Sequence, residues 1–170
     1  ICIRTGVAKE MKQYLEMLNT ILDSGYESGD RTGVGTKAVF GHMIKFNLRE
    51  GFPLVTTKKV YWKGVVHELL WFIKGETNIK YLVDNGVNIW NDWPYKQYVE
   101  HCKANNETFF TQEEFVNCIK NNVPLLIGAL GPVYGKQWRN WIGNDFKSYD
   151  QLQIAINTIK NNPTSRRIIV

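Results

Sequence analysis

A glutamate in the middle of the most hydrophobic segment of the chain is the residue whose position most suggests chemistry. Glu68 lies within residues 62–74, and its neighbours at helical spacing are apolar: Val65, Trp71 and Phe72. Because a carboxyl group on such a face is expected to be shielded from water, it could hold and release protons near neutral pH. The alternative is a structural carboxylate paired with a lysine or arginine, and the pattern alone leaves both interpretations open.

Three arginines stand where a guanidinium group could bind an anion. Arg31 lies in a glycine-rich loop, residues 28–36, whose glycines permit close approach of a phosphate or carboxylate. Arg166 and Arg167 are adjacent, so in a strand one would face solvent while the other meets an anion or a partner chain. For each of them the alternative is a solvated side chain without a ligand.

Aromatic residues and a lysine form a further group of candidates. Trp90 and Trp93, together with Ile89, could form an apolar wall for a flat ring. Tyr134, within a glycine-rich loop, could place a phenol hydroxyl group at a site. Lys58 could meet an anionic group. The alternatives are a place in the core for the tryptophans and ordinary solvation for the lysine.

The elements that must position these residues are mostly helices. Apolar residues at three- and four-residue steps predict a helix that starts at residue 11 and stops at Gly25. Residues 62–74 predict a central buried helix, because apolar residues cover more than half of its circumference. A short helix is predicted between residues 77 and 86, and a capping box at residues 111–114 opens another.

Strands and boundaries complete the predicted organisation. Residues 37–47 and 166–170 are interpreted as strands. The more polar stretch at about 94–124 is interpreted as a peripheral, variable helical insert, and residues 1–10 as a leader or expression-derived segment.

Composition limits the possible classes of protein. The chain has 170 residues, of which 44% are hydrophobic and 22% charged, and this excludes a disordered chain, a collagen and a coiled coil. The formal net charge is +5, but the basic residues are scattered, so nucleic-acid binding is not expected as a main role. No apolar run is long enough to cross a bilayer, and residues 1–10 hold no apolar core of a signal peptide, so no membrane partner is expected.

Cysteine and histidine usage points to a reducing compartment without a metal site. The three cysteines form no close pair, which argues against a disulfide framework and against a zinc motif. The three histidines are far apart in the sequence, so no metal is expected. A cytoplasmic location is the corresponding prediction.

Six segments taken together, in this order, resemble motifs of the thymidylate synthase family. They are residues 30–36, 52–59, 67–72, 89–93, 130–139 and 165–170. The resemblance covers residues 11–170, with 94–124 as the variable insert. It implies an α+β fold in which helices pack on a twisted mixed β-sheet, incomplete in this chain. Residues 11–170 would then be the N-terminal part of a single domain that works as a symmetric homodimer.

The resemblance also implies a reaction and the residues that serve it. The family converts 2′-deoxyuridine 5′-monophosphate (dUMP) to thymidylate (dTMP), with 5,10-methylenetetrahydrofolate as the donor of the one-carbon unit and of hydride. By position, Arg31 resembles the arginine that holds the nucleotide phosphate, and Arg166 and Arg167 resemble the pair that reaches the partner's phosphate. Glu68 resembles the glutamate that organises proton transfer, and Tyr134 the tyrosine beside the nucleophile.

The folate side of the site is implied in the same way. Ile89, Trp90 and Trp93 resemble the wall against which the folate ring lies. Lys58 resembles a lysine near the glutamate tail of folate, and Tyr61 occupies a position where the family often has a histidine that contacts folate.

The nucleophile that the resemblance calls for is a cysteine in a Pro-Cys-His segment. Cys2, Cys102 and Cys118 do not stand in that context, so we expect that the 170-residue polypeptide alone is inactive and represents part of a synthase. Two other interpretations stay open. One is a deoxypyrimidine-monophosphate hydroxymethylase of the same family, and the other is a non-catalytic fragment that dimerises or binds RNA.

Overall fold

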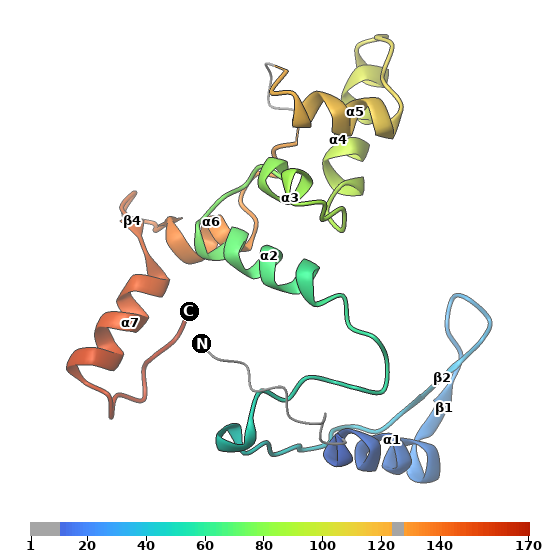
Figure 1. Cartoon of the computed structure of the whole chain (residues 1–170), viewed down its shortest axis with the longest axis vertical. Coiled ribbons are helices and arrows are strands. Elements are labelled where there is room, and N and C mark those ends of the chain that lie inside the picture. The colour runs from blue at the N-terminus through green and yellow to red at the C-terminus, as the bar shows by residue number, and fades with distance from the viewer. Residues whose placement is uncertain (1–10, 124–127) are drawn as a thin grey trace. The chain divides into compact units, whose positions relative to one another are not determined.

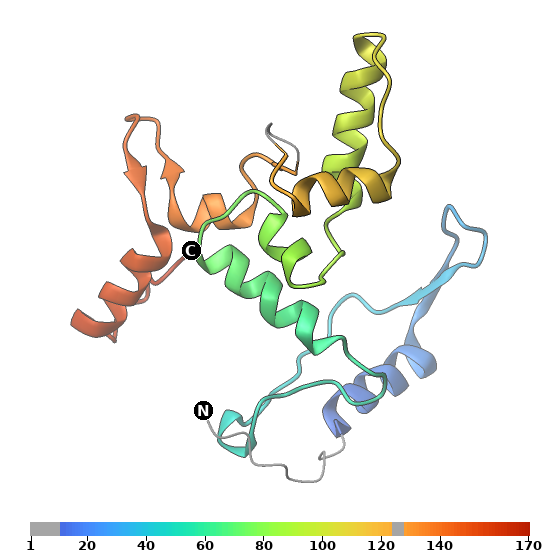
Figure 2. The same ribbon diagram turned by 45° about the horizontal axis from the view of Figure 1, so that its top comes forward.

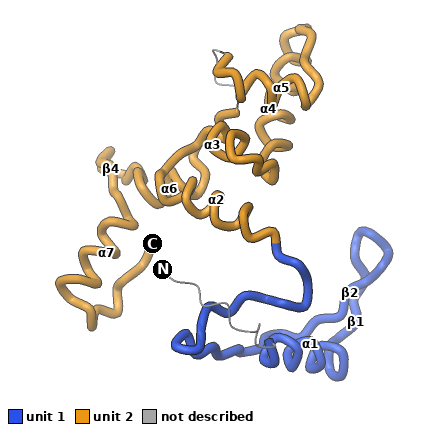
Figure 3. The backbone as a smooth tube through the Cα atoms, viewed as in Figure 1, with its two compact units in different colours: residues 1–60 blue, residues 61–170 orange. Residues whose placement is uncertain are grey.

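The computed structural model describes residues 11–123 and 128–170, and the chain divides into two compact units. The first unit is residues 1–60 and the second is residues 61–170 (Figure 3). Residues 1–10, interpreted above as a leader, lie outside the described residues. No helix in the described ranges is both long enough and apolar enough to span a membrane.

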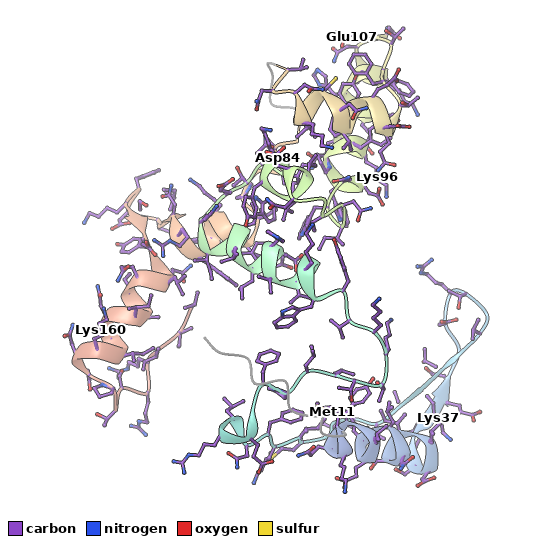
Figure 4. The ribbon with its side chains drawn as sticks, viewed as in Figure 1. Met11, Lys37, Asp84, Lys96, Glu107 and Lys160 are labelled. Carbon is purple, nitrogen blue, oxygen red and sulfur yellow. The ribbon has the colours of Figure 1, made fainter. Side chains whose placement is uncertain are left out.

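The described residues of the first unit, 11–60, form one helix, one hairpin and one short 3₁₀ turn (Figure 1). Its elements are α1 (Lys12–Ser24), β1 (Tyr26–Ser28), β2 (Thr36–Ala38) and η1 (Leu48–Glu50). β1 and β2 pair antiparallel, with Tyr26 opposite Ala38. The Nζ atom of Lys37, labelled in Figure 4, donates to the carbonyl of Leu22 and so ties the hairpin to α1.

The second unit is built mainly from helices. They are α2 (Trp62–Ile73), α3 (Lys80–Asp84), α4 (Asp92–Ala104), α5 (Gln112–Lys120), α6 (Tyr134–Arg139) and α7 (Gln151–Asn161). β3 (Trp141–Ile142) and β4 (Ser148–Tyr149) form an antiparallel hairpin between α6 and α7. α2 contacts α3 and α6, and α3 contacts α5, as the turned view in Figure 2 shows.

One apolar core holds the second unit together. Its buried members come from α2, α5 and the region around α3: Trp71, Ile79, Leu82, Val83, Val87, Phe115 and Ile119. Two of them, Phe115 and Ile119, belong to α5 and are 0% and 4% exposed. The stretch 94–124, interpreted above as a peripheral insert, thus contains α5, two of whose side chains complete the core, and its status as a variable insert stays a prediction.

The caps of the helices follow local chemistry. The predicted capping box of α5 is present: the Thr111 hydroxyl accepts from the Glu114 amide, and the Glu114 carboxylate accepts from the Thr111 amide at 2.8 Å. These bonds, the backbone one first, lower the pKa of the Glu114 carboxyl.

The α+β class is confirmed, since helices combine with short antiparallel strands.

Three expectations about single elements are wrong in whole or in part. α2 is not buried all round: Gly64 and Trp71 are buried, whereas Val65 and Leu69 are 44% and 48% exposed. The reason is that its described neighbours cover one side of the helix only. Residues 166–170 form no strand, and residues 37–47 do so only as far as Ala38. A strand needs a hydrogen-bonded neighbour, and no described strand pairs with residues 39–47 or 166–170.

Candidate active site

The predicted carboxylate and one of the predicted tryptophans contact each other directly. The Nε1–H group of Trp90 donates to Oε1 of Glu68 at an N–O distance of 2.7 Å. Both side chains are half-buried. This distance is at the short end of the range for N–H···O hydrogen bonds. The bond leaves the second carboxylate oxygen of Glu68 as the atom able to meet a ligand or water.

An aromatic cluster surrounds this pair. The ring of Phe72 lies edge-on to Trp90, with centroids 6.2 Å apart, and to Tyr134, with centroids 5.2 Å apart. Trp90 and Tyr134 are themselves 6.4 Å apart. The structure therefore brings Glu68 and Tyr134 to the same indole, that of Trp90. Tyr134 is 53% exposed, and it begins α6 rather than lying in a loop.

Phe72 is the member of this cluster that sequence reasoning did not assign to the site. It follows Glu68 by four residues, so both project from the same side of α2. That spacing is the signal that could have identified it. Edge-to-face contacts of this kind add about 0.5–1.5 kcal/mol each beyond area burial.

Trp71, in the core of the second unit, packs against Trp90. Trp71 is fully buried, and its Nε1–H group donates to the carbonyl of Asn78 at 2.8 Å. Its ring lies 5.6 Å from that of Trp90. Because close-packed interiors resist displacement, the position of Trp90, and with it the hydrogen bond to Glu68, depends on the core of the second unit.

The other two residues of the predicted wall lie at the surface. Ile89 and Trp93 are 49% and 59% exposed. The Nζ atom of Lys96, labelled in Figure 4, lies 5.8 Å from the centre of the Trp93 ring, which is within the range of a cation–π contact. Directly after Trp90, α4 is tied to α5, since Gln112 Nε2 donates to Asp92 Oδ1 at 2.6 Å.

The loop that carries Arg31 is organised by the residue before it. The Asp30 carboxylate accepts from the Thr32 hydroxyl at 2.7 Å, the Thr32 amide at 3.0 Å and the Gly35 amide at 3.3 Å. These bonds, the one from the Thr32 hydroxyl above all, lower the pKa of the Asp30 carboxyl. Gly33 and Gly35 have φ of +77° and +83°, in the region that favours glycine. Sequence reasoning missed Asp30, although Asp followed two residues later by Thr is typical of such turns.

The remaining candidates fall in separate parts of the chain. Arg31 and Lys58 belong to the first unit, and both are exposed. Arg166 and Arg167 follow α7 in the second unit and are exposed as well. The backbone around this pair is shaped by Ser165, whose hydroxyl accepts from the Arg167 amide at 3.2 Å.

Within this α+β fold, the candidate site combines a half-buried carboxylate that is hydrogen-bonded to an indole with a phenol ring whose centroid lies 6.4 Å from that of the indole ring. A model of the family described as thymidylate synthase matches residues 12–170. The chain therefore belongs to the thymidylate synthase family.

Curated relatives with that name resemble the chain closely. The thymidylate synthase of Mycoplasma genitalium is 53% identical over 162 residues, which cover 94% of this chain and 54% of the relative. The thymidylate synthase of Mesoplasma florum is 54% identical over 162 residues with the same coverage. That of Aster yellows witches'-broom phytoplasma is 52% identical over 163 residues. The chain thus spans about half the length of the curated relatives that it matches.

Proposed function

We propose that this chain supplies the N-terminal part of an enzyme that methylates dUMP to dTMP, with 5,10-methylenetetrahydrofolate as co-substrate. The observation that carries the proposal is the bond from Trp90 to Glu68 at 2.7 Å beside Tyr134, in a chain that the family model matches over residues 12–170. The curated relatives named above are called thymidylate synthases, which favours methyl transfer over the hydroxymethylase alternative.

In this proposal Glu68 moves protons and orders water beside the pyrimidine. One of its carboxylate oxygens is held by Trp90, so the group has a defined direction while its other oxygen remains able to exchange a proton. The ring of Tyr134 lies 6.4 Å from that of Trp90, and in this proposal its phenol hydroxyl would stand beside the nucleophile. A positioned acid–base group of this kind contributes typically about 10²–10⁴-fold to the rate.

The aromatic side of the site would receive the folate. Ile89, Trp90 and Trp93 offer apolar surface for a flat ring, and two of these three side chains are about half-exposed, as a binding wall requires. The co-substrate supplies the one-carbon unit and the hydride. Lys58 would meet its anionic tail and Tyr61 would lie at the edge of the ring, and both side chains are exposed.

The nucleotide phosphate would be held by arginines from two subunits. Arg31 is presented by a loop that Asp30 organises, and its guanidinium group suits a phosphate. Arg166 and Arg167 are exposed, as side chains that reach a partner subunit must be before association. We propose a symmetric homodimer in which this pair completes the partner's phosphate site. The location would be cytoplasmic, because Cys102 and Cys118 are free thiols.

A fusion protein tests the proposal with the missing nucleophile supplied. Residues 11–170 are joined to the part of the Mycoplasma genitalium synthase that follows its matched region, and release of tritium from C5 of labelled dUMP is measured. We expect turnover by the fusion and none by the 170-residue chain alone, whose three cysteines lie outside any Pro-Cys-His segment. A folded fusion that binds neither dUMP nor folate, or turnover by the chain alone, would contradict the proposal. The relative's segment expressed by itself is the control.

A single substitution of Glu68 in that fusion tests its proposed role in proton transfer most directly. Glu68→Gln keeps an oxygen that can accept from Trp90 but removes the group that ionises. The expected result is a fall in kcat of about 10²–10⁴-fold with dUMP affinity within a few-fold of the parent. Glu107→Gln, at the exposed loop position labelled in Figure 4, is the matched control and should leave kcat unchanged.

A further inference from the structure

We propose that Tyr61 is a positioning residue for the site: its hydroxyl group holds the segment that leads into Trp90, and through Trp90 it orients Glu68. The proposal rests on the function proposed above for Glu68 and Trp90. It gives Tyr61 a role that requires no contact with folate.

The ring of Tyr61 packs against Gly64 of α2. Tyr61 directly precedes this helix, and Gly64, one turn further on, is buried. A Cβ atom added at Gly64 would lie 2.5 Å from Cδ1 and 2.6 Å from Cε1 of the Tyr61 ring, closer than real contacts allow. The ring therefore occupies the space that the missing side chain leaves, and its position depends on glycine at 64.

The hydroxyl group of Tyr61 bonds to the C-terminal end of another helix, α3. It donates to the carbonyl of Gly86 at 3.1 Å. Gly86 has φ +69° and closes α3: its amide donates to the carbonyl of Val83 at 3.0 Å, and the Val87 amide donates to the carbonyl of Leu82 at 2.9 Å. This is the pattern of a helix end that stops at glycine. The carbonyl of Gly86 faces away from α3, and Tyr61 supplies its donor.

The held carbonyl lies four residues before Trp90 in the sequence. Val87, between them, is 1% exposed and anchored in the core, whereas Asn88 and Ile89 are exposed. The segment from Gly86 to Trp90 is therefore fixed by the Tyr61 bond and by Val87 at its start, and by the bond to Glu68 at its end. Removal of the hydroxyl group leaves that stretch of backbone with one attachment fewer and loosens the indole at Glu68.

The test measures the indole N–H group of Trp90 in the 170-residue chain, without substrate. Its NMR resonance is assigned by its absence in Trp90→Phe, and its hydrogen-exchange rate is compared between the parent and Tyr61→Phe. Loss of one hydrogen bond predicts exchange faster by about two- to tenfold. The indole N–H of Trp71, bonded to Asn78 in the core, should exchange at the parent rate.

Matched variants separate this effect from a general loosening of the unit. Tyr95→Phe removes a hydroxyl that donates to the Phe110 carbonyl at the same 3.1 Å, and it should leave Trp90 unchanged. Gly64→Ala should displace the ring and reproduce the effect of Tyr61→Phe, whereas Gly41→Ala, with open space around it, should not. The double variant of Tyr61 and Gly64 should exchange no faster than the stronger single variant, because both act on one contact.

The outcomes decide the proposal independently of the enzymatic function. Faster exchange at Trp90 alone supports it. Unchanged exchange at Trp90 in Tyr61→Phe, or an equal rise at Trp71, overturns it. In the fusion enzyme Tyr61→Phe should lower kcat/KM several-fold without unfolding. If the exchange responds while the fusion fails to methylate dUMP, then the positioning role stands and the proposed function fails.

Discussion

The two units of this chain hold their functional residues by different means. In the first unit Met11 is the buried apolar side chain among the described residues, while Val34 and Phe52 are 87% and 74% exposed. Its loop around Arg31 is shaped by bonds to Asp30. In the second unit a core of aromatic and aliphatic side chains positions Trp90 against Glu68. Local hydrogen bonds shape the loop that carries Arg31, whereas packing in the core orients the indole that bonds to Glu68.

The largest expected effect would come from a cavity in the core of the second unit. Phe115→Ala removes a fully buried ring, so we expect a loss of about 3–5 kcal/mol in the free energy of unfolding. Urea unfolding followed by tryptophan fluorescence measures it, because all six tryptophans lie in residues 61–170.

The matched substitution in the first unit is Val34→Ala, at an exposed position. It should change the same transition by less than about 0.5 kcal/mol. Equal effects of the two substitutions would remove the contrast between the units.

A smaller effect is expected at the cap of α5. Thr111→Ala deletes the hydroxyl that accepts from the Glu114 amide and should cost about 1 kcal/mol in the same fluorescence measurement. Thr111→Ser keeps the hydroxyl and should restore most of the loss. If Thr111→Ser is as destabilised as Thr111→Ala, the cap does not support α5 in the way described.

The smallest expected effect is the loss of the Asp30 hydrogen bonds at low pH, and it is confined to the first unit. The hydrogen bonds of Asp30 lower its pKa, so they are complete above the pKa of an unfolded aspartate, about 4. They are lost as the pH falls through the lower pKa of the folded loop. We expect the amides of Thr32 and Gly35 to lose protection from hydrogen exchange over that range, as NMR can show. Asp30→Asn should abolish this pH dependence and leave the tryptophan-monitored transition unchanged.

Much of this molecule follows from short-range sequence patterns. The capping box at Thr111 and the stop of α1 at Gly25 are local, so the sequence predicts them correctly. Spacing on α2 singled out Glu68, and residue type and position singled out Trp90 and Tyr134, to which the resemblance then gave roles; Trp90 does bond to Glu68, and Tyr134 packs near Trp90. The roles of all the candidate residues, Arg31, Lys58, Arg166 and Arg167 included, stay predictions.

Other features depended on neighbours that are distant in the sequence. The sequence by itself determined the α+β class, the family and the candidate residues, because periodicity, caps and motif order are properties of contiguous residues. Tertiary structure alone decided that α5 completes the core, that Trp90 bonds to Glu68, and that Tyr61 reaches Gly86. These contacts join segments that are at least 22 residues apart in the sequence. Which groups meet is therefore set by the folding of the whole chain and not by local propensity.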